Sequence, residues 1–233
     1  MQAIILAAGQ GNRLAEFNAD GRPKCLLEFG GRSLLERQLH SLFTLGVGRA
    51  TLVVGYEADR VIEHVSTLAS RPQVDFAYNP AFRHGSVLSL LAAQQALTAG
   101  GPVLVLDADV LFHPRLLERL LASTAANACL LDRNFERGEE PVKIALRQGR
   151  IVEFRKRLAE GLDHDVVGES VGFFRFNTET AAKIARHCDR YRLEGLLDAC
   201  YEEVLRDVML AAPRAFEPVD VSGLPWIEID FAE

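Results

Sequence analysis

Apolar positions in the first half of the chain occur either in short unbroken runs or at helical spacing. Four runs, each typical of a buried strand, cover residues 3–6, 50–55, 74–78 and 103–106. Apolar residues three and four positions apart predict three helices between the runs, over residues 33–45, 58–69 and 86–97. This repeated order of strand and helix is typical of a mainly parallel sheet with helices on both faces.

The pattern changes after about residue 125, where strands predominate. Six strands are predicted at 128–131, 142–146, 151–154, 171–176, 215–219 and 226–229, and two helices at 178–188 and 196–208. The chain contains no linker, repeat or low-complexity segment. We therefore expect one α/β domain, residues 1–233, with a Rossmann-like, mainly parallel (mixed) sheet flanked by helices. Residues 126–233 would add a small β-rich lobe to the half formed by residues 1–125.

Composition restricts the classes of partner. A chain of 233 residues is long enough for one α/β domain with a full core. The formal net charge of −6 argues against binding to nucleic acid or to an anionic membrane. No apolar stretch is long enough to cross a membrane, and the N-terminus lacks the layout of a signal peptide. The four scattered cysteines are typical of reduced packing residues in a cytoplasmic protein, not of disulfides or a zinc site.

The first predicted strand leads directly into a loop with two glycines, Gly9 and Gly11. Glycines let backbone N–H groups approach a phosphate closely, and Arg13 and Lys24 add positive charge. The Walker pattern is absent, and the third glycine of the dinucleotide pattern is replaced by Leu14. The segment therefore predicts a site for a polyphosphate, and the alternative is a plain turn after a strand.

Two carboxylates, Asp107 and Asp109, follow the buried strand at 103–106. The carboxyl ends of parallel strands share one edge of a sheet, so the pair is expected beside the glycine loop. Carboxylate oxygens suit Mg²⁺, which takes one or two of them together with phosphate and water. The alternatives are an Asp pair that caps a turn, and the Asp-x-Asp of nucleotide-sugar glycosyltransferases.

Near the end of the chain, Glu228 and Asp230 lie two positions apart. On a strand, residues at this spacing point to the same face, so both carboxylates could reach a common metal ion. The alternative is that they are charges on an exposed edge strand.

Cationic and aromatic residues of the second half are candidates for holding a small acceptor. Lys143 and Lys156 could bind an anionic group. A cationic amine or trimethylammonium could be held by Glu169, Tyr191 or Trp226, although aromatic residues at such positions are more often part of the core.

Taken together, these segments resemble the nucleotidylyltransferases, and most closely the phosphocholine, 2-aminoethylphosphonate and inositol-phosphate cytidylyltransferases. The resemblance rests on Leu6-Ala7-Ala8-Gly9-x-Gly11-x-Arg13-Leu14, on Pro23-Lys24-Cys25-Leu26-Leu27, on the loop 79–90 and on Trp226-Ile227-Glu228-Ile229-Asp230. It implies that CMP passes from CTP to a small phosphate- or phosphonate-bearing alcohol or amine, with phosphocholine or 2-aminoethylphosphonate as the expected acceptor. Pyrophosphate leaves, and Mg²⁺ is the expected cofactor.

The resemblance also assigns roles to individual residues. Catalysis falls to Arg13 and Lys24. Nucleotide contacts fall to Leu6, Ala7, Ala8, Gly9, Gly11, Asn12, Arg13, Lys24, Gly85, Ser86 and Asp107. Metal binding falls to Asp109 and Asp230, with Glu228 as a helper. The acceptor side includes Lys156, Lys143, Glu169, Gly172 and Trp226. Taken without the resemblance, Ser86 is equally interpreted as the N-cap of the helix that follows it.

Two other functions stay open. The first is a sugar-1-phosphate nucleotidylyltransferase that uses UTP, GTP or dTTP, and the second is a regulatory module that binds a nucleotide without turnover. A homodimer, or fusion to a further domain, is also compatible with the sequence.

Overall fold

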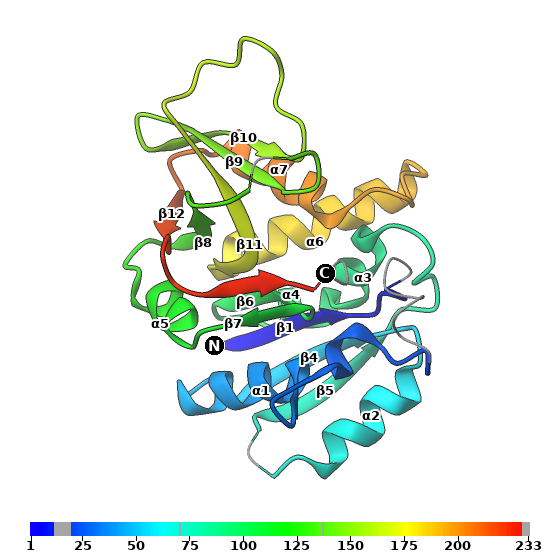
Figure 1. Cartoon of the computed structure of the whole chain (residues 1–233). Helices are drawn as coiled ribbons and strands as arrows, with labels where there is room; N and C mark the ends of the chain where they lie inside the picture. The colour runs from blue at the N-terminus through cyan, green and yellow to red at the C-terminus, as the bar shows by residue number, and fades with distance from the viewer. Residues whose placement is uncertain (12–19, 70, 137, 230–233) are drawn as a thin grey trace.

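A mixed β-sheet forms the centre of the computed structural model, which describes residues 1–11, 20–69, 71–136 and 138–229 (Figure 1). Along the sheet the strand order is β10-β9-β11-β6-β1-β4-β5, and β8 and β12 continue from β11. These strands are β1 (Gln2–Ala7), β4 (Arg49–Val54), β5 (Gln73–Tyr78), β6 (Val103–Asp107), β8 (Asn127–Asp132), β9 (Lys143–Arg147), β10 (Arg150–Arg155), β11 (Val166–Phe176) and β12 (Phe216–Asp220).

Strand direction divides the sheet into two parts. Strands β6, β1, β4 and β5 are parallel to one another, as the order of strand and helix predicts. Strand β11 runs antiparallel to β6, β8 and β9, and β9 forms an antiparallel hairpin with β10. The predicted α/β class with a mixed sheet and a β-rich lobe is confirmed, and β11 joins the two parts.

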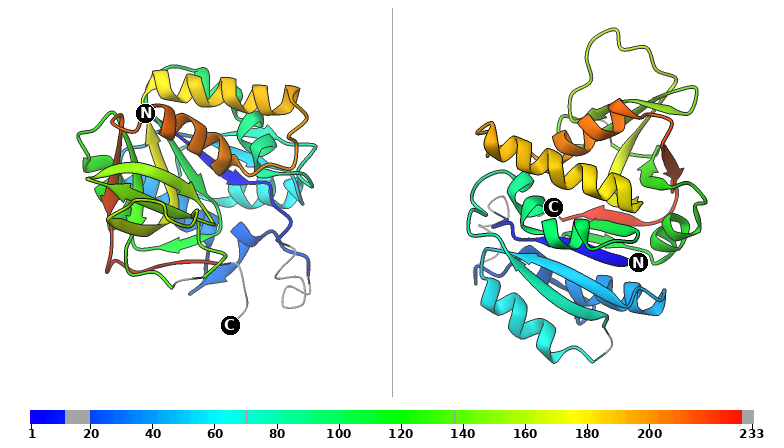
Figure 2. Two further views of the ribbon diagram at one scale, coloured as in Figure 1. Left: turned by 90° about the horizontal axis from the view of Figure 1, so that it is seen from above. Right: turned by 180° about the vertical axis from the view of Figure 1, so that it is seen from behind.

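Helices cover both faces of the sheet, as the two rotated views of Figure 2 show. One face packs against α1 (Leu34–Thr44), α2 (Ala58–Thr67) and α5 (Arg115–Ala122). The other packs against α3 (Ser86–Ala92), α4 (Gln94–Thr98), α6 (Thr178–Leu193) and α7 (Tyr201–Ala211). Successive residues of β1 alternate between the two cores, with Ile4 in one and Ile5 in the other. Burial on both faces explains why this strand is an unbroken apolar run.

Most predicted elements are present, with shifted ends. Ser33 caps α1 as expected, because its hydroxyl accepts a hydrogen bond from the backbone N–H of Glu36 (3.0 Å). The predicted helix over 86–97 is wrong as one element, since the backbone breaks at Ala93 between α3 and α4. The second predicted helix of the lobe begins at Tyr201 instead of Leu196, because residues before it form a turn against α3.

Several short elements were not predicted. Helix α5 and strand β7 (Val110–Phe112) follow Asp109, and β7 pairs with β13 (Trp226–Glu228). A short helix, η2 (Lys24–Leu26), precedes the small hairpin of β2 (Glu28–Phe29) and β3 (Arg32–Ser33). Pairing of β7 with β13 brings the end of the chain back beside Asp109. In the part of the chain that the structure describes, no helix is long and apolar enough to cross a membrane.

Candidate functional site

A cleft of about 270 Å³ lies at the carboxyl ends of β1 and β6. The topology of parallel strands places ligand sites at this edge. The predicted residues that line the cleft are Leu6, Ala7, Ala8, Gly9, Gly11, Lys24, Ser86, Asp107, Asp109 and Glu228. The structure therefore brings together residues from four distant parts of the sequence. Arg13, Asn12 and Asp230 lie outside the described residues, so their predicted roles stay predictions.

Lys24 is the positive group of this cleft, since no other Lys or Arg occurs among the described residues that line it. Its Nζ lies 3.4 Å from Oδ2 of Asp109. Gly11, with φ of 64°, lies against the Lys24 side chain, and a Cβ there would come within 2.8 Å of Lys24 Cγ. The glycine therefore leaves room for the lysine to lie beside the loop that follows β1.

The neighbouring Cys25 takes no part as a nucleophile. Burial, together with the negative charge of Asp109, raises the pKa of its thiol to about 12. A thiol with this pKa stays protonated near neutral pH, and the thiolate is the reactive form.

Asp107 is held by two side-chain hydrogen bonds. The Tyr201 hydroxyl donates a hydrogen bond to its Oδ2 (2.7 Å), and Gln38 Nε2 donates to its backbone carbonyl (2.8 Å). Burial raises the pKa of Asp107 well above its ordinary value, and the negative charges of Asp109, Glu202 and Glu228 add to the rise. The neutral form of this carboxyl is therefore more favoured than in an exposed aspartate.

Gly172 lies against Asp107 and not against a bound molecule. Its φ of 76° falls in the left-handed region, and a Cβ on this residue would overlap Oδ2 of Asp107. The group that approaches Gly172 closely is thus a carboxylate of the chain itself. The acceptor-side role of Gly172 stays a prediction.

Hard oxygen ligands for a cation are present at the same edge. Asp109 and Glu228 both line the cleft, and the backbone N–H of Ile229 donates to the Asp109 carbonyl (2.9 Å). Two carboxylates open to a phosphate-sized space fit Mg²⁺, which takes few protein ligands. The described residues contain no cluster of three or more metal-binding side chains, and Asp230 lies outside them. The magnesium site therefore stays a prediction.

The loop before α3 differs from expectation in its hydrogen bonds. The N–H of Gly85 donates to the carbonyl of Leu197 (2.9 Å), so this group is not available to a nucleobase. Gly85, not Ser86, is the N-cap of α3, and the Ser86 hydroxyl instead accepts from the N–H of Tyr201 (2.9 Å). Ser86 still lines the cleft, whereas Gly85 serves to join this loop to the turn before α7.

A second cavity, of about 410 Å³, adjoins the cleft, because Glu202 lines both. Lys156 lines this second cavity, and its Nζ donates to Glu140 (2.9 Å). Lys143 is used differently from the prediction. Its Nζ donates to the carbonyls of Gly138, Pro141 and Lys156 at 2.8, 3.1 and 2.7 Å. These three bonds use all the hydrogens of an ammonium group, so Lys143 holds the loop before β9.

Of the three groups suggested for a cationic acceptor, Trp226 and Glu169 both lie against Asp132, and Tyr191 lies elsewhere. Trp226 donates from Nε1 to Oδ2 of Asp132 (2.7 Å), and Glu169 pairs with Asp132 across β11 and β8. Burial, with the charge of Asp132, raises the pKa of Glu169 to about 7 against the opposing effect of Lys143. Tyr191 donates instead to Asp207 on α7 (3.0 Å). None of the three lines the cleft or the second cavity as described.

Sequence reasoning missed Tyr201 and Glu202, which lie in the first turn of α7 and line the cleft. Nothing in the sequence separates Glu202 from Glu203 beside it. The helical phase could have found them, since Tyr201 continues the apolar spacing of Val204, Leu205 and Val208.

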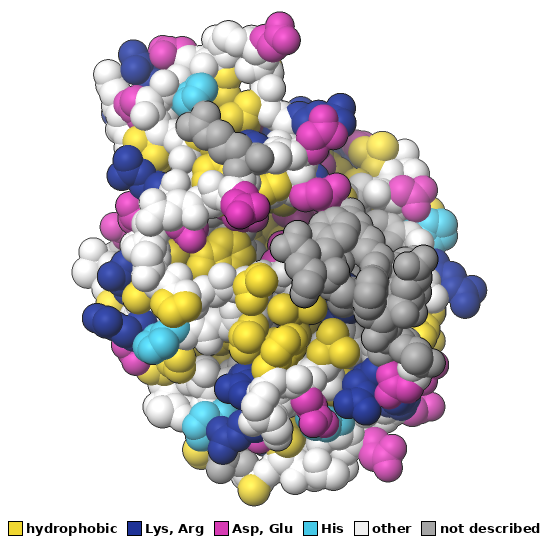
Figure 3. Space-filling model, viewed as in Figure 1, with side chains coloured by type: hydrophobic (Ala, Val, Ile, Leu, Met, Phe, Trp, Pro, Cys, Tyr) yellow, Lys and Arg dark blue, Asp and Glu magenta, His cyan; other side chains and the backbone are white. Residues whose placement is uncertain are grey.

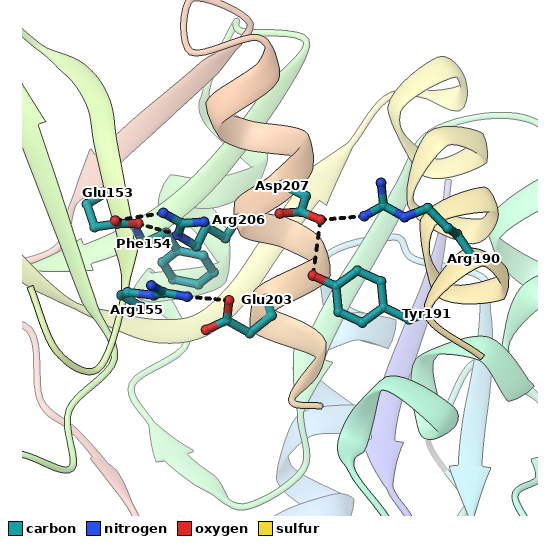
Figure 4. A network of polar contacts seen from close by, with 8 residues as sticks. All are labelled: Glu153, Phe154, Arg155, Arg190, Tyr191, Glu203, Arg206 and Asp207. Carbon is teal, nitrogen blue, oxygen red and sulfur yellow. Dashed lines mark hydrogen bonds and ion pairs between the residues drawn. The ribbon is translucent and has the colours of Figure 1, made fainter. Parts of the chain in front are cut away.

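Helix α7 is fastened on both sides, which fixes the position of its first turn (Figure 4). Towards β10, Arg206 binds both carboxylate oxygens of Glu153, and Arg155 donates to Glu203 (2.7 Å). Towards α6, Asp207 accepts hydrogen bonds from Tyr191 and from Arg190 (2.6 Å). A helix held in this way keeps Tyr201 and Glu202 at the cleft.

Comparisons with known proteins agree with this geometry. The family model of the MobA-like NTP transferase domain matches residues 3–203. The CMP-5'-(3-aminopropyl)phosphonate synthase of Streptomyces rubellomurinus is 29% identical over 99% of this chain and 37% of its own length. The bifunctional IPC transferase and DIPP synthase of Rubrobacter xylanophilus is 31% identical over 98% of this chain and 49% of its own length. The chain thus spans about half the length, or less, of these two relatives.

A solved structure shares the fold over almost the whole chain. The inositol-1-phosphate CTP transferase from T. maritima has a TM-score of 0.79, with 21% identity, over 99% of this chain and 89% of its own.

Proposed function

The chain belongs to the MobA-like NTP transferase family, and from that premise we propose that it transfers CMP from CTP to a small acceptor. The acceptor carries a phosphate or phosphonate, and pyrophosphate is released. The observation that carries the proposal is the cleft where the loop after β1, Lys24 and Asp109 meet. A relative named for an aminopropylphosphonate CMP product and one named as an IPC transferase support the cytidylyl class and the phosphonate or phosphate acceptor.

Positioning and charge account for the chemistry of such a reaction. An oxygen of the acceptor attacks the α-phosphorus of CTP, a new P–O bond forms, and the bond to the pyrophosphate oxygen breaks. The acceptor is already an anion near neutral pH, so the step needs no general base, and the protein must align two anions that repel each other. Lys24 and the backbone N–H groups of the glycine loop would neutralise the triphosphate as charge moves to the leaving group.

Asp109 and Glu228, with Asp230 outside the described residues, are the side chains that would hold Mg²⁺. When bound, the ion supplies charge neutralisation at the phosphate oxygens. Lys24 lies within ion-pair distance of Asp109, so the same carboxylate would orient the lysine when no metal is present. Asp107, which accepts a hydrogen bond from Tyr201, would support the backbone of the Asp109 turn.

The test is pyrophosphate release in the presence of Mg²⁺. CTP, UTP, GTP and dTTP are each combined with phosphocholine, 2-aminoethylphosphonate, inositol-1-phosphate and glucose-1-phosphate. The proposal expects release with CTP and a phosphonate or non-sugar phosphate. Release with glucose-1-phosphate and UTP, GTP or dTTP alone would instead assign a sugar-1-phosphate nucleotidylyltransferase. Nucleotide binding by calorimetry without any release would indicate a binding module.

A further inference from the structure

The second cavity is lined almost entirely by charged side chains, and all but one of them have a partner in it. Three ion pairs account for six of these groups: Arg155 with Glu203 (2.7 Å), Lys156 with Glu140 (2.9 Å) and Arg157 with Glu139 (2.8 Å). The remaining charged residue of the described lining is Glu202. The cavity thus contains four carboxylates and three cationic side chains, which leaves it one positive charge short.

Glu202 belongs to none of these three ion pairs, although the charge of Lys156 acts on its carboxylate. Its Oε2 is buried and has no hydrogen-bond partner in the described part of the chain. A buried carboxylate oxygen that lacks a donor is costly, because it has lost water and gained nothing in return. The position is nevertheless held firmly, since the ion pairs of Figure 4 fasten α7 to β10 and to α6. The fold therefore holds at a fixed place a carboxylate whose Oε2 lacks a donor among the described residues.

The place of this carboxylate fits one end of an acceptor. Glu202 lines both cavities, so a molecule that reaches it from the cleft has its other end beside Lys24 and Asp109. The face shown in Figure 3 has acidic side chains below the protruding loop that follows β10. The surroundings thus favour a positive group at this end of the acceptor and an anionic group at the other.

The walls of the cavity distinguish two kinds of cation. A quaternary ammonium has no hydrogen to donate and is bound chiefly by aromatic faces. The described residues that line the second cavity include no aromatic side chain, and its two uncharged members are Val142 and Cys200. A primary ammonium donates three hydrogen bonds and suits an oxygen that lacks a donor.

From these observations we propose that Glu202 selects an acceptor with a primary ammonium group, which it binds in the second cavity. This inference rests on the proposed cytidylyl transfer. It makes one residue, Glu202, responsible for the choice of acceptor. In this arrangement the ammonium donates to the Glu202 carboxylate, and the phosphate or phosphonate of the same molecule lies in the cleft.

The test compares three acceptors that differ only at one end: the 2-aminoethyl, 2-trimethylammonioethyl and 2-hydroxyethyl phosphonates, with the corresponding phosphates as a second series. The wild type is expected to favour the primary amine over both others by roughly 10- to 100-fold in kcat/KM, the effect of one charged hydrogen bond. In Glu202→Gln this preference is expected to fall to about 3-fold or less. The loss should lie mainly in the KM of the amine, with the hydroxyl acceptor nearly unchanged.

The matched control is Glu179→Gln, which removes an exposed carboxylate from the first turn of α6 and should leave all three rates unchanged. The melting temperature and the affinity for CTP are measured for each variant. If Glu202→Gln melts at a lower temperature than the wild type, Glu202→Asp is tested in its place. The proposal is wrong if Glu202→Gln keeps the preference, or if phosphocholine-like acceptors are used as well as the amine. It is also wrong if the variant loses all acceptors equally with a changed Mg²⁺ dependence, which would place Glu202 with the metal site.

The two proposals fail in different ways. A wild type that releases pyrophosphate from CTP with all three acceptors alike contradicts the role of Glu202 and leaves cytidylyl transfer standing. A wild type that is silent with CTP and every acceptor overturns both.

Discussion

The cleft and the hairpin of β9 and β10 both carry many charges, but they hold them differently. In the cleft, Asp107, Asp109, Glu202 and Glu228 face one lysine, and burial raises the pKa of Asp107. Directly after the hairpin, Lys156 and Arg157 pair with nearby glutamates while still exposed. Carboxylates gathered around a single cation repel one another, whereas charges that pair on a surface satisfy one another.

The largest expected effect is a loss of turnover when the positive group of the cleft is removed. Lys24→Ala removes the one Lys or Arg of the described lining, and turnover should fall by roughly 10²- to 10³-fold, as for loss of one preorganised donor to the reacting oxygens. Asp109→Ala should be impaired to a similar degree. Pyrophosphate release measures the loss, and circular dichroism should show an unchanged fold.

Lys183→Ala is the control for this prediction, because Lys183 is an exposed lysine of α6 that pairs with Glu179. Rates close to those of the wild type in Lys24→Ala would contradict the assignment of the cleft.

A smaller effect, on stability, is expected at Gly172, where β11 lies against the cleft residue Asp107. Gly172→Ala places a Cβ against the Asp107 carboxylate at a positive φ, and we expect a loss of about 2–4 kcal/mol in the free energy of unfolding. Gly149→Ala has a similar φ of 72° with open space around it, so it should cost only about 1 kcal/mol. Urea denaturation of the two variants separates the collision from the backbone strain. Equal losses of unfolding free energy in the two variants would show that contact with Asp107 adds nothing to the cost at Gly172.

The smallest expected effect is a pH-dependent change in stability at Glu169, at the boundary between the cleft and the hairpin. The pKa of Glu169 is raised to about 7 in the folded protein from an ordinary 4.5. The folded state therefore holds more protons between these values, and the free energy of unfolding decreases as pH rises from about 4.5 to about 7. Glu169→Gln removes this decrease, so the variant should melt higher than the wild type at pH 8, by a few degrees at most.

Near pH 4.5 the two melting temperatures should converge, because the protonated acid and the amide are alike in charge. Glu63→Gln, an exposed change on α2, is the control. A difference of the same size at both pH values would mean that the charge of Glu169 is not responsible.

Sequence reasoning succeeded wherever the backbone determines position. The unbroken apolar runs of β1 and β6 require burial, and burial in a parallel sheet brings the ends of both strands to one edge. Gly11, Lys24 and Asp109 therefore met as expected.

The same reasoning was less accurate wherever side chains choose among nearby partners. Lys143 lies in a correctly predicted strand, yet its ammonium group is used by the backbone carbonyls of Gly138, Pro141 and Lys156. Glu202 and Glu203 look equivalent in the sequence, but one pairs with Arg155 and the other faces the cleft. Such choices depend on distances across the tertiary structure, which periodicity does not contain.

The central place of β1 also sets an order of events during synthesis. Among the described strands β1 comes first, yet one of its two neighbours, β6, begins only at Val103. Until residues 103–109 have left the ribosome, Lys24 has no Asp109 to face and the loop after β1 has no opposite wall. Protection of ribosome-bound chains from protease by CTP should therefore begin only beyond that length.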